Sequence, residues 1–128
     1  MFTIKQINDL HDRLGNMESL PDYLRALNAI GVALFESYVC DGHSQFFSSD
    51  GRSLVSDAAH ELLTIADVAD PVGVIEHLAQ HERGETDYLT MSVGLAASGV
   101  EKWTMDTNDL TVTYLDKQGN TLLLEPLH

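Results

Sequence analysis

The sequence predicts an α+β domain in which two helix–helix–hairpin halves form one antiparallel sheet covered by helices. Three observations support this prediction. The chain has 128 residues without a visible linker, so we expect a single domain over residues 1–128. Apolar residues at helical spacing are followed by short strand-like segments. One residue pattern also occurs twice, which indicates an internal duplication.

The duplicated pattern relates residues 27–51 to residues 95–119, 68 positions further along the chain and without a gap. We therefore expect half-repeats at about 20–51 and 88–119 that solve the same packing problem. Aromatic character is kept as well as identity. The matching pairs are Leu27 and Leu95, Ala29 and Ala97, Gly31 and Gly99, Val32 and Val100, Phe35 and Trp103, Asp41 and Asp109, Phe46 and Tyr114, and Gly51 and Gly119.

The first half begins with a predicted helix over residues 3–14, where apolar residues recur at helical spacing. A second helix is predicted over residues 21–31, because proline is tolerated in a first turn and glycine often ends a helix. Strands are predicted over 32–40 and 43–49. The Asp-Gly pair at 41–42 between them favours a tight type I′ hairpin.

The second half is preceded by an extra helix, predicted over residues 56–66. The next helix opens at Asp70-Pro71 and stops before Gly84. Another helix is capped by Thr86 or Asp87 and runs to about Ser98. Apolar and polar residues then alternate, as in strands of an antiparallel sheet, and the predicted strands are 100–107, 110–116 and 121–125.

The composition restricts the kinds of partner. Seven basic residues against 20 acidic ones give a net charge of −13, which repels phosphate backbones, so we expect no nucleic-acid binding. No apolar run approaches a bilayer span, so we expect no membrane partner. A single cysteine and the lack of a basic-then-apolar leader predict a cytoplasmic location.

His77 and His81 are the candidate metal ligands. Four residues apart on a helix, they project from the same face, as in many zinc sites. Asp87, Glu82 or His60 could supply a third ligand. The alternative is that the two histidines are solvated residues of a polar helix, and we predict no cofactor.

The Thr86-Asp87-Tyr88 segment has two interpretations, as a binding motif or as a helix cap followed by a packed tyrosine ring. Trp103 and its counterpart Phe35 occupy equivalent strand positions. They are core anchors if they face the helices, which we favour, and a partner surface if they face outward. The candidate binding residues are His81, Asp87, Tyr88 and Trp103.

The segments from His81 to Tyr88, Gly99 to Trp103 and Tyr114 to Gly119 follow one another at a characteristic spacing. In these segments the chain resembles a bacterial family of small uncharacterised proteins with a YbcV-like domain of unknown function, some of them labelled phage envelope protein-like. The resemblance extends from about residue 20 to 125. It implies a compact α+β protein without an established activity, and a prophage ancestry.

Two functions are therefore open. The first is a small, acidic, soluble, non-enzymatic binding or protein-interaction domain that associates with a protein partner or with itself through an open sheet edge. The alternative is a small metal-dependent hydrolase that uses His77, His81 and Asp87. Serine-nucleophile motifs, phosphate-binding glycine loops and dinucleotide fingerprints do not occur in the sequence.

Overall fold

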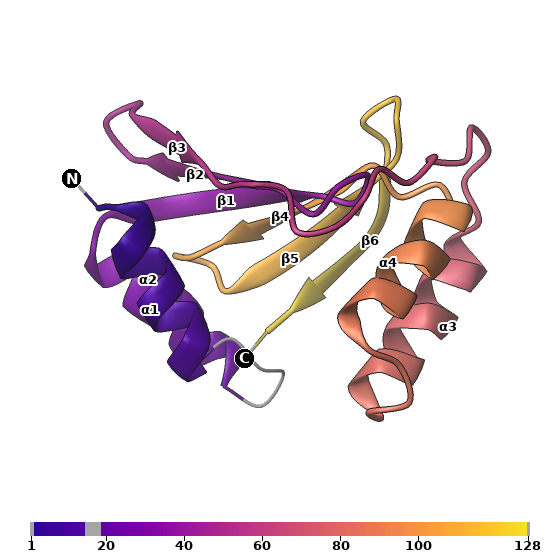
Figure 1. Cartoon of the computed structure of the whole chain (residues 1–128), viewed down its shortest axis with the longest axis horizontal. Helices are drawn as coiled ribbons and strands as arrows, with labels where there is room; N and C mark the ends of the chain where they lie inside the picture. Colours follow the sequence, from indigo (N-terminus) through magenta and orange to yellow (C-terminus); the bar gives the residue numbers. More distant parts are fainter. Residues whose placement is uncertain (1, 15–18, 128) are drawn as a thin grey trace.

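The computed structural model describes residues 2–14 and 19–127, and Figure 1 shows the arrangement of their helices and strands. None of the described helices is both long enough and apolar enough to span a bilayer. In chain order the elements are α1 (Ile4–Leu14), α2 (Leu20–Ala29), β1 (Val32–Tyr38), β2 (Ser44–Ser48), β3 (Ser53–Val55), α3 (Pro71–Glu82), α4 (Tyr88–Ala97), β4 (Lys102–Asp106), β5 (Thr111–Leu115) and β6 (Thr121–Pro126).

All six strands form one antiparallel sheet in the order β3-β2-β1-β4-β5-β6, which confirms the predicted α+β class. Each half of the described chain runs helix, helix and three strands. The first strands of the two halves, β1 and β4, pair with each other at the centre of the sheet. Their register places Ser37 opposite Trp103.

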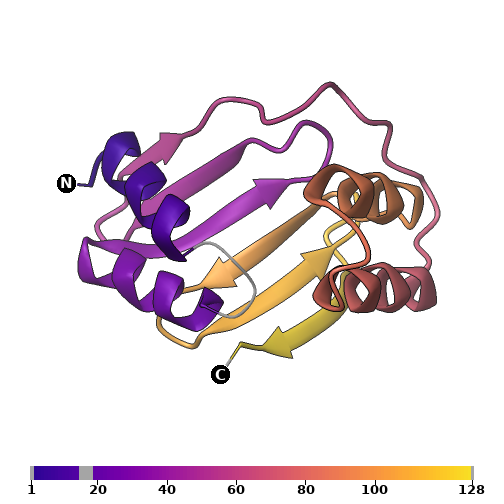
Figure 2. The same ribbon diagram turned by 60° about the horizontal axis from the view of Figure 1, so that its bottom comes forward.

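Both helix pairs lie on one face of the sheet, α1 and α2 near one end of the central strands and α3 and α4 near the other (Figures 1 and 2). Each pair encloses its own cluster of buried side chains, one around Leu27 and Phe35 and the other around Leu95 and Trp103. Phe35 and Trp103 are 5% and 7% exposed, so the prediction that they are core anchors is confirmed.

Local signals in the sequence account for the helix ends. The carboxylate of Asp70 accepts a hydrogen bond from the backbone N–H of Gly73 at 3.1 Å and caps α3. Asp87 caps α4 in the same way, accepting from Thr90 N–H at 2.7 Å. After α4 the chain turns at Gly99, whose φ of +88° is a conformation that side chains rarely adopt.

The helix predicted over residues 56–66 is wrong, because this segment is an irregular connection. Its backbone N–H groups donate to distant carbonyls instead of making helical bonds. Ala59 donates to Asp41 at 2.8 Å and Leu63 to Cys40 at 2.6 Å. Leu62 is 80% exposed, so the apolar spacing that suggested a helix buries no continuous face. The short strand β3, which precedes this connection, was not predicted.

The tight type I′ turn predicted at Asp41-Gly42 is also wrong. That turn needs a left-handed backbone at both central residues, and of the two only Gly42 adopts it, with φ +78°. The strands end earlier, and residues 39–43 form a longer loop. The Asp41 carboxylate closes this loop by accepting a hydrogen bond from the backbone N–H of His43 at 3.0 Å.

Candidate ligand-binding site

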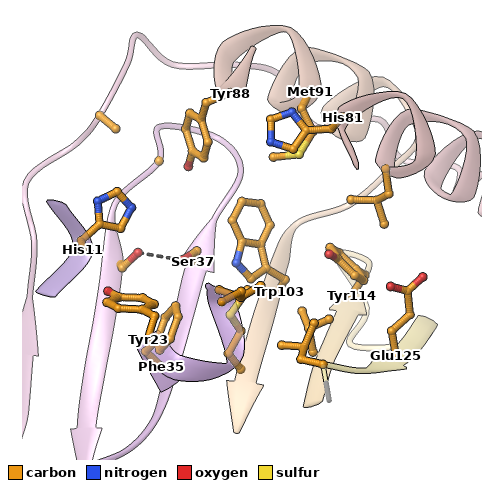
Figure 3. Close-up of a pocket in the computed structure, with 18 of the residues that line it drawn as sticks. His11, Tyr23, Phe35, Ser37, His81, Tyr88, Met91, Trp103, Tyr114 and Glu125 are labelled. Carbon is orange, nitrogen blue, oxygen red and sulfur yellow. Dashed lines mark hydrogen bonds between the residues drawn. The ribbon is translucent and has the colours of Figure 1, made fainter. Parts of the chain in front are cut away.

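A cavity of about 500 Å³ lies over the helix-facing side of the sheet and is lined by residues of both helix pairs. Figure 3 shows side chains from the strands and from both pairs pointing into this common space. The strands β1 and β4 pass beneath it, so the cavity spans both halves of the chain. Its aromatic lining consists of His11, Tyr23, Phe35, Phe46, His81, Tyr88, Trp103 and Tyr114.

One part of the aromatic lining belongs to the first half of the chain. The ring of Tyr23 on α2 meets the ring of Phe35 on β1 edge to face, with centroids 6.3 Å apart. Phe35 in turn contacts Phe46 on β2 at 5.2 Å. His11 of α1 packs edge-on against Tyr23 at 5.7 Å. These contacts fix the ring orientations, so this wall is formed before any ligand arrives.

The other part belongs to the second half and follows the same plan. Trp103 on β4 contacts Tyr114 on β5 at 6.2 Å between ring centroids. Tyr88, the first residue of α4, meets Trp103 edge to face at 6.5 Å. Tyr88 is 41% exposed and lies at the boundary between the cavity and solvent. The cavity therefore has an aromatic wall contributed by each half.

Three polar atoms on mostly buried side chains of these walls form no hydrogen bond with the described residues. They are the hydroxyls of Tyr23 and Tyr114 and the indole N–H of Trp103, on side chains that are 4%, 8% and 7% exposed. Burial raises the pKa of Tyr23 to about 12. Burial is also the main reason that the pKa of Tyr114 lies far above its usual value. Both phenols are therefore neutral, and each hydroxyl can donate one hydrogen bond and accept another.

Two carboxylates lie at the Tyr114 end of the cavity. Glu125 on β6 is half-buried and projects from the sheet beside Tyr114, and Glu82 ends α3. Burial raises the pKa of Glu125, and the negative charge of Glu82 raises it further. Both charges also act on the Tyr114 hydroxyl and raise its pKa. Neither carboxylate forms an ion pair within the described chain.

The two histidines predicted as metal ligands occupy different surroundings. His81 lines the cavity, and its Nδ1 lies 3.0 Å from the carbonyl oxygen of Thr86, so this nitrogen carries the proton and donates. His77 packs against Gly94 of α4, where an added Cβ would lie 2.5 Å from its ring. In the parts of the chain that are described, no three His, Cys, Asp or Glu side chains gather to hold a metal. The metal site therefore stays a prediction without a third ligand.

Three of the four predicted binding residues line the cavity, namely His81, Tyr88 and Trp103. Asp87 does not line it. The carboxylate of Asp87 caps α4, and its hydrogen bonds from Thr90 lower its pKa, with a smaller contribution from the charge of His81. Asp87 therefore holds Tyr88 at the start of the helix and has a structural part in the site.

Residues 8–126 match the model of a family described as "Protein of unknown function (DUF1398)". The chain belongs to the DUF1398 family. The description of DUF1398 assigns no activity and does not mention phage envelope proteins, so the phage label suggested by the resemblance stays a prediction. A comparison with curated proteins gives no match. The function of this DUF1398 protein must therefore be argued from the cavity itself.

Sequence reasoning did not identify several lining residues of this DUF1398 protein, including Tyr23, Tyr114 and Glu125. A usable signal was present. The aligned aromatic pairs of the two half-repeats fall on inward-facing positions of the strands that follow the helices, as Phe46 and Tyr114 show. Glu125 gives a second signal, because acidic residues are uncommon at inward-facing strand positions.

Proposed function

We propose that this chain is a non-enzymatic binding domain that takes a small, largely apolar and aromatic molecule into its cavity. The observation that carries the proposal is the cavity itself, about 500 Å³ in volume and walled by aromatic side chains from both halves of the chain. Small-molecule sites in proteins are typically concave spaces of roughly 300–1,000 Å³ with apolar walls and a few polar groups. This cavity matches that description in size and chemistry.

The reactive groups in and near the cavity support binding rather than catalysis. The hydroxyls of Ser37 and Ser44 are hydrogen-bonded to each other at 2.7 Å, so neither is paired with a general base. Cys40 lies in the 39–43 loop, whose Gly42 lines the cavity. Burial and then the charge of Asp41 raise the pKa of the Cys40 thiol. A raised pKa disfavours the thiolate that a nucleophile needs.

The variant Ser37→Leu tests this proposal, because Ser37 is buried in the cavity floor and leucine fills space above it. We expect the wild-type protein to enhance the fluorescence of N-phenyl-1-naphthylamine, a neutral aromatic probe. In Ser37→Leu the affinity for the probe should fall at least about tenfold. The leucine side chain occupies space that the probe would fill, so the probe buries less apolar surface against the cavity walls. Fluorescence titration measures both affinities, and circular dichroism reports whether each protein is folded.

The matched control is Thr104→Leu, which adds the same side chain on the neighbouring strand β4 but on the opposite face of the sheet. It should bind the probe as the wild type does. A wild-type protein that leaves the probe unchanged, or a folded Ser37→Leu protein with unchanged affinity, would show that the cavity is not a binding site.

A second candidate function, self-association through a sheet edge, is favoured by the strand β6. It is an edge strand of the described sheet, and its Leu124 is 59% exposed. An edge strand offers unpaired backbone groups to another chain. We therefore expect a concentration-dependent dimer in sedimentation velocity, weakened at least tenfold by Leu124→Lys. Val93→Lys on α4, also an exposed apolar residue (49%), is the control; equal effects of the two changes, or a monomeric wild type, would contradict this candidate.

We also propose that the two halves arose by internal duplication. The repeated order of helix, helix and three strands supports this origin, as do the equivalent inward positions of Phe35 and Trp103. A cytoplasmic location and a prophage ancestry, both suggested by the sequence, stay predictions.

A further inference from the structure

The unpaired polar atoms of the cavity walls indicate that its ligand carries a polar group. Buried tyrosine hydroxyls and indole N–H groups nearly always have a hydrogen-bond partner in folded proteins. Tyr23, Trp103 and Tyr114 are each more than nine-tenths buried and line the cavity, yet their polar atoms have no such partner within the described chain. A ligand that is only hydrocarbon would leave all three unsatisfied, whereas a polar group can bond to the two tyrosine hydroxyls, which both donate and accept.

The charges around the cavity indicate the sign of that polar group. Glu125 and Glu82 bring two negative charges to the end where the Tyr114 hydroxyl lies. All seven lysine and arginine residues fall within the described ranges, and none of them lines the cavity. Six of the seven pair with carboxylates elsewhere. The two glutamates therefore lack a counter-charge from the protein's own lysines and arginines.

Aromatic faces add a second attraction for a positive charge. A cation within about 6 Å of the centre of a tryptophan or tyrosine ring is attracted by the negative face of the ring. Trp103 and Tyr114 lie side by side in the wall next to Glu125 (Figure 3). The basic side chains of the described lining are His11 and His81, and the Nδ1–H of His81 is already donated to the Thr86 carbonyl.

We propose that the ligand of this cavity is a lipophilic cation, an amine whose positive nitrogen lies at the Glu125–Glu82 end while its apolar body packs against Trp103. This assignment rests on the proposed binding function and adds the chemical class of the ligand. A cation between the two carboxylates reduces their mutual repulsion, because its positive charge offsets part of their negative charge. An ammonium nitrogen has only hydrogens to donate, so it bonds to the carboxylates and can also donate to the oxygen of the Tyr114 hydroxyl.

The test is a matched series of three naphthyl compounds, measured by isothermal titration calorimetry at pH 8. 2-(1-Naphthyl)ethylamine is a cation, 2-(1-naphthyl)ethanol is neutral and 1-naphthylacetic acid is an anion. At this pH an alkyl amine is protonated and a carboxylic acid is ionised. We expect the amine to bind about tenfold more tightly than the alcohol, and the acid more weakly than both, because the cation gains a partly desolvated charge pair.

The double variant Glu82→Gln, Glu125→Gln removes the charges and keeps the shape of the cavity. Its preference for the amine over the alcohol should shrink to about twofold or less, while its affinity for the alcohol stays within about twofold of the wild type. Glu76→Gln is the control, because Glu76 lies on the exposed side of α3, outside the lining. The control removes one negative charge outside the lining, so it reports how a loss of net charge by itself changes the preference for the amine.

The outcomes separate this inference from the proposed function. Equal affinities for amine and alcohol in the wild type would overturn the cationic assignment and leave the binding function in place. The same conclusion follows if the double variant keeps the tenfold preference. If the wild type binds none of the three compounds and also fails to bind N-phenyl-1-naphthylamine, the binding function itself is wrong.

Discussion

Replacing Gly99 with alanine should lower the free energy of unfolding by about 3 kcal/mol, because two separate costs add. The backbone of Gly99 has φ +88°, where a side chain is strained by about 1–2 kcal/mol. An added Cβ would also lie 2.9 Å from the Cα of Ala69 and 3.0 Å from the carbonyl oxygen of Val68. Backbone atoms cannot rotate away, so the chain itself must shift. Urea unfolding followed by circular dichroism measures the loss.

Two other glycines are matched controls for this change. Gly119 has a similar φ of +83° but nothing within 4 Å of its added Cβ, so Gly119→Ala should cost only about 1 kcal/mol. Gly31 is the equivalent of Gly99 in the first half, with φ +105°, and its Cβ would meet the side chain of Phe2 at 3.8 Å. Losses of the same size at Gly99 and Gly119 would mean that the close approach of the 68–69 backbone does not contribute.

Replacing Leu95 with alanine should cost about 3 kcal/mol for a different reason. Leu95 is fully buried in the cluster that also contains Met91 and Trp103. Removing its branched end loses apolar transfer energy and leaves a hole, and such changes typically cost about 2–5 kcal/mol. Trp103 belongs to the same cluster, so we expect the wavelength of its fluorescence maximum to shift. Trp103 is the single tryptophan of the chain, which makes this signal specific.

The control is Leu89→Ala on the same helix. Leu89 is 49% exposed, so its truncation should change the free energy of unfolding by no more than about 0.5 kcal/mol. Leu27, the equivalent of Leu95 in the first half, is also fully buried and should show the larger loss. An Leu95→Ala protein as stable as Leu89→Ala would contradict the assignment of this cluster as a core.

Features of the fold that depend on short-range chemistry were predictable from the sequence. The start of α3 follows from the Asp70-Pro71 pair, and the start of α4 follows from the capping carboxylate of Asp87. The strands of the second half follow from their alternation, which places Val112 and Tyr114 on one face. In each case the residues that decide the structure lie within a few positions of one another.

The incorrect predictions concern contacts between residues that are far apart in the sequence. The segment 56–66 has helical spacing, but its backbone N–H groups donate to carbonyls of the 39–43 loop, and no residue near the segment predicts that contact. The cavity could not be predicted from the sequence either, because its size depends on how far apart the two helix pairs lie on the sheet. Its members Tyr23 and Tyr114 are 91 positions apart. A sequence pattern can predict that each residue is buried, but it cannot predict that both line the same cavity.

The division of the interior into two clusters has a mechanical consequence. Among the described residues, the Leu27 cluster and the Leu95 cluster share two border residues, Met105 and Leu127, and are joined through the central β1–β4 pairing. The interior thus consists of two separately packed lobes on one shared sheet. A molecule bound in the proposed site would contact both lobes at once, so its binding energy would favour the state in which both are folded. Such a ligand would complete the apolar interior between the two lobes.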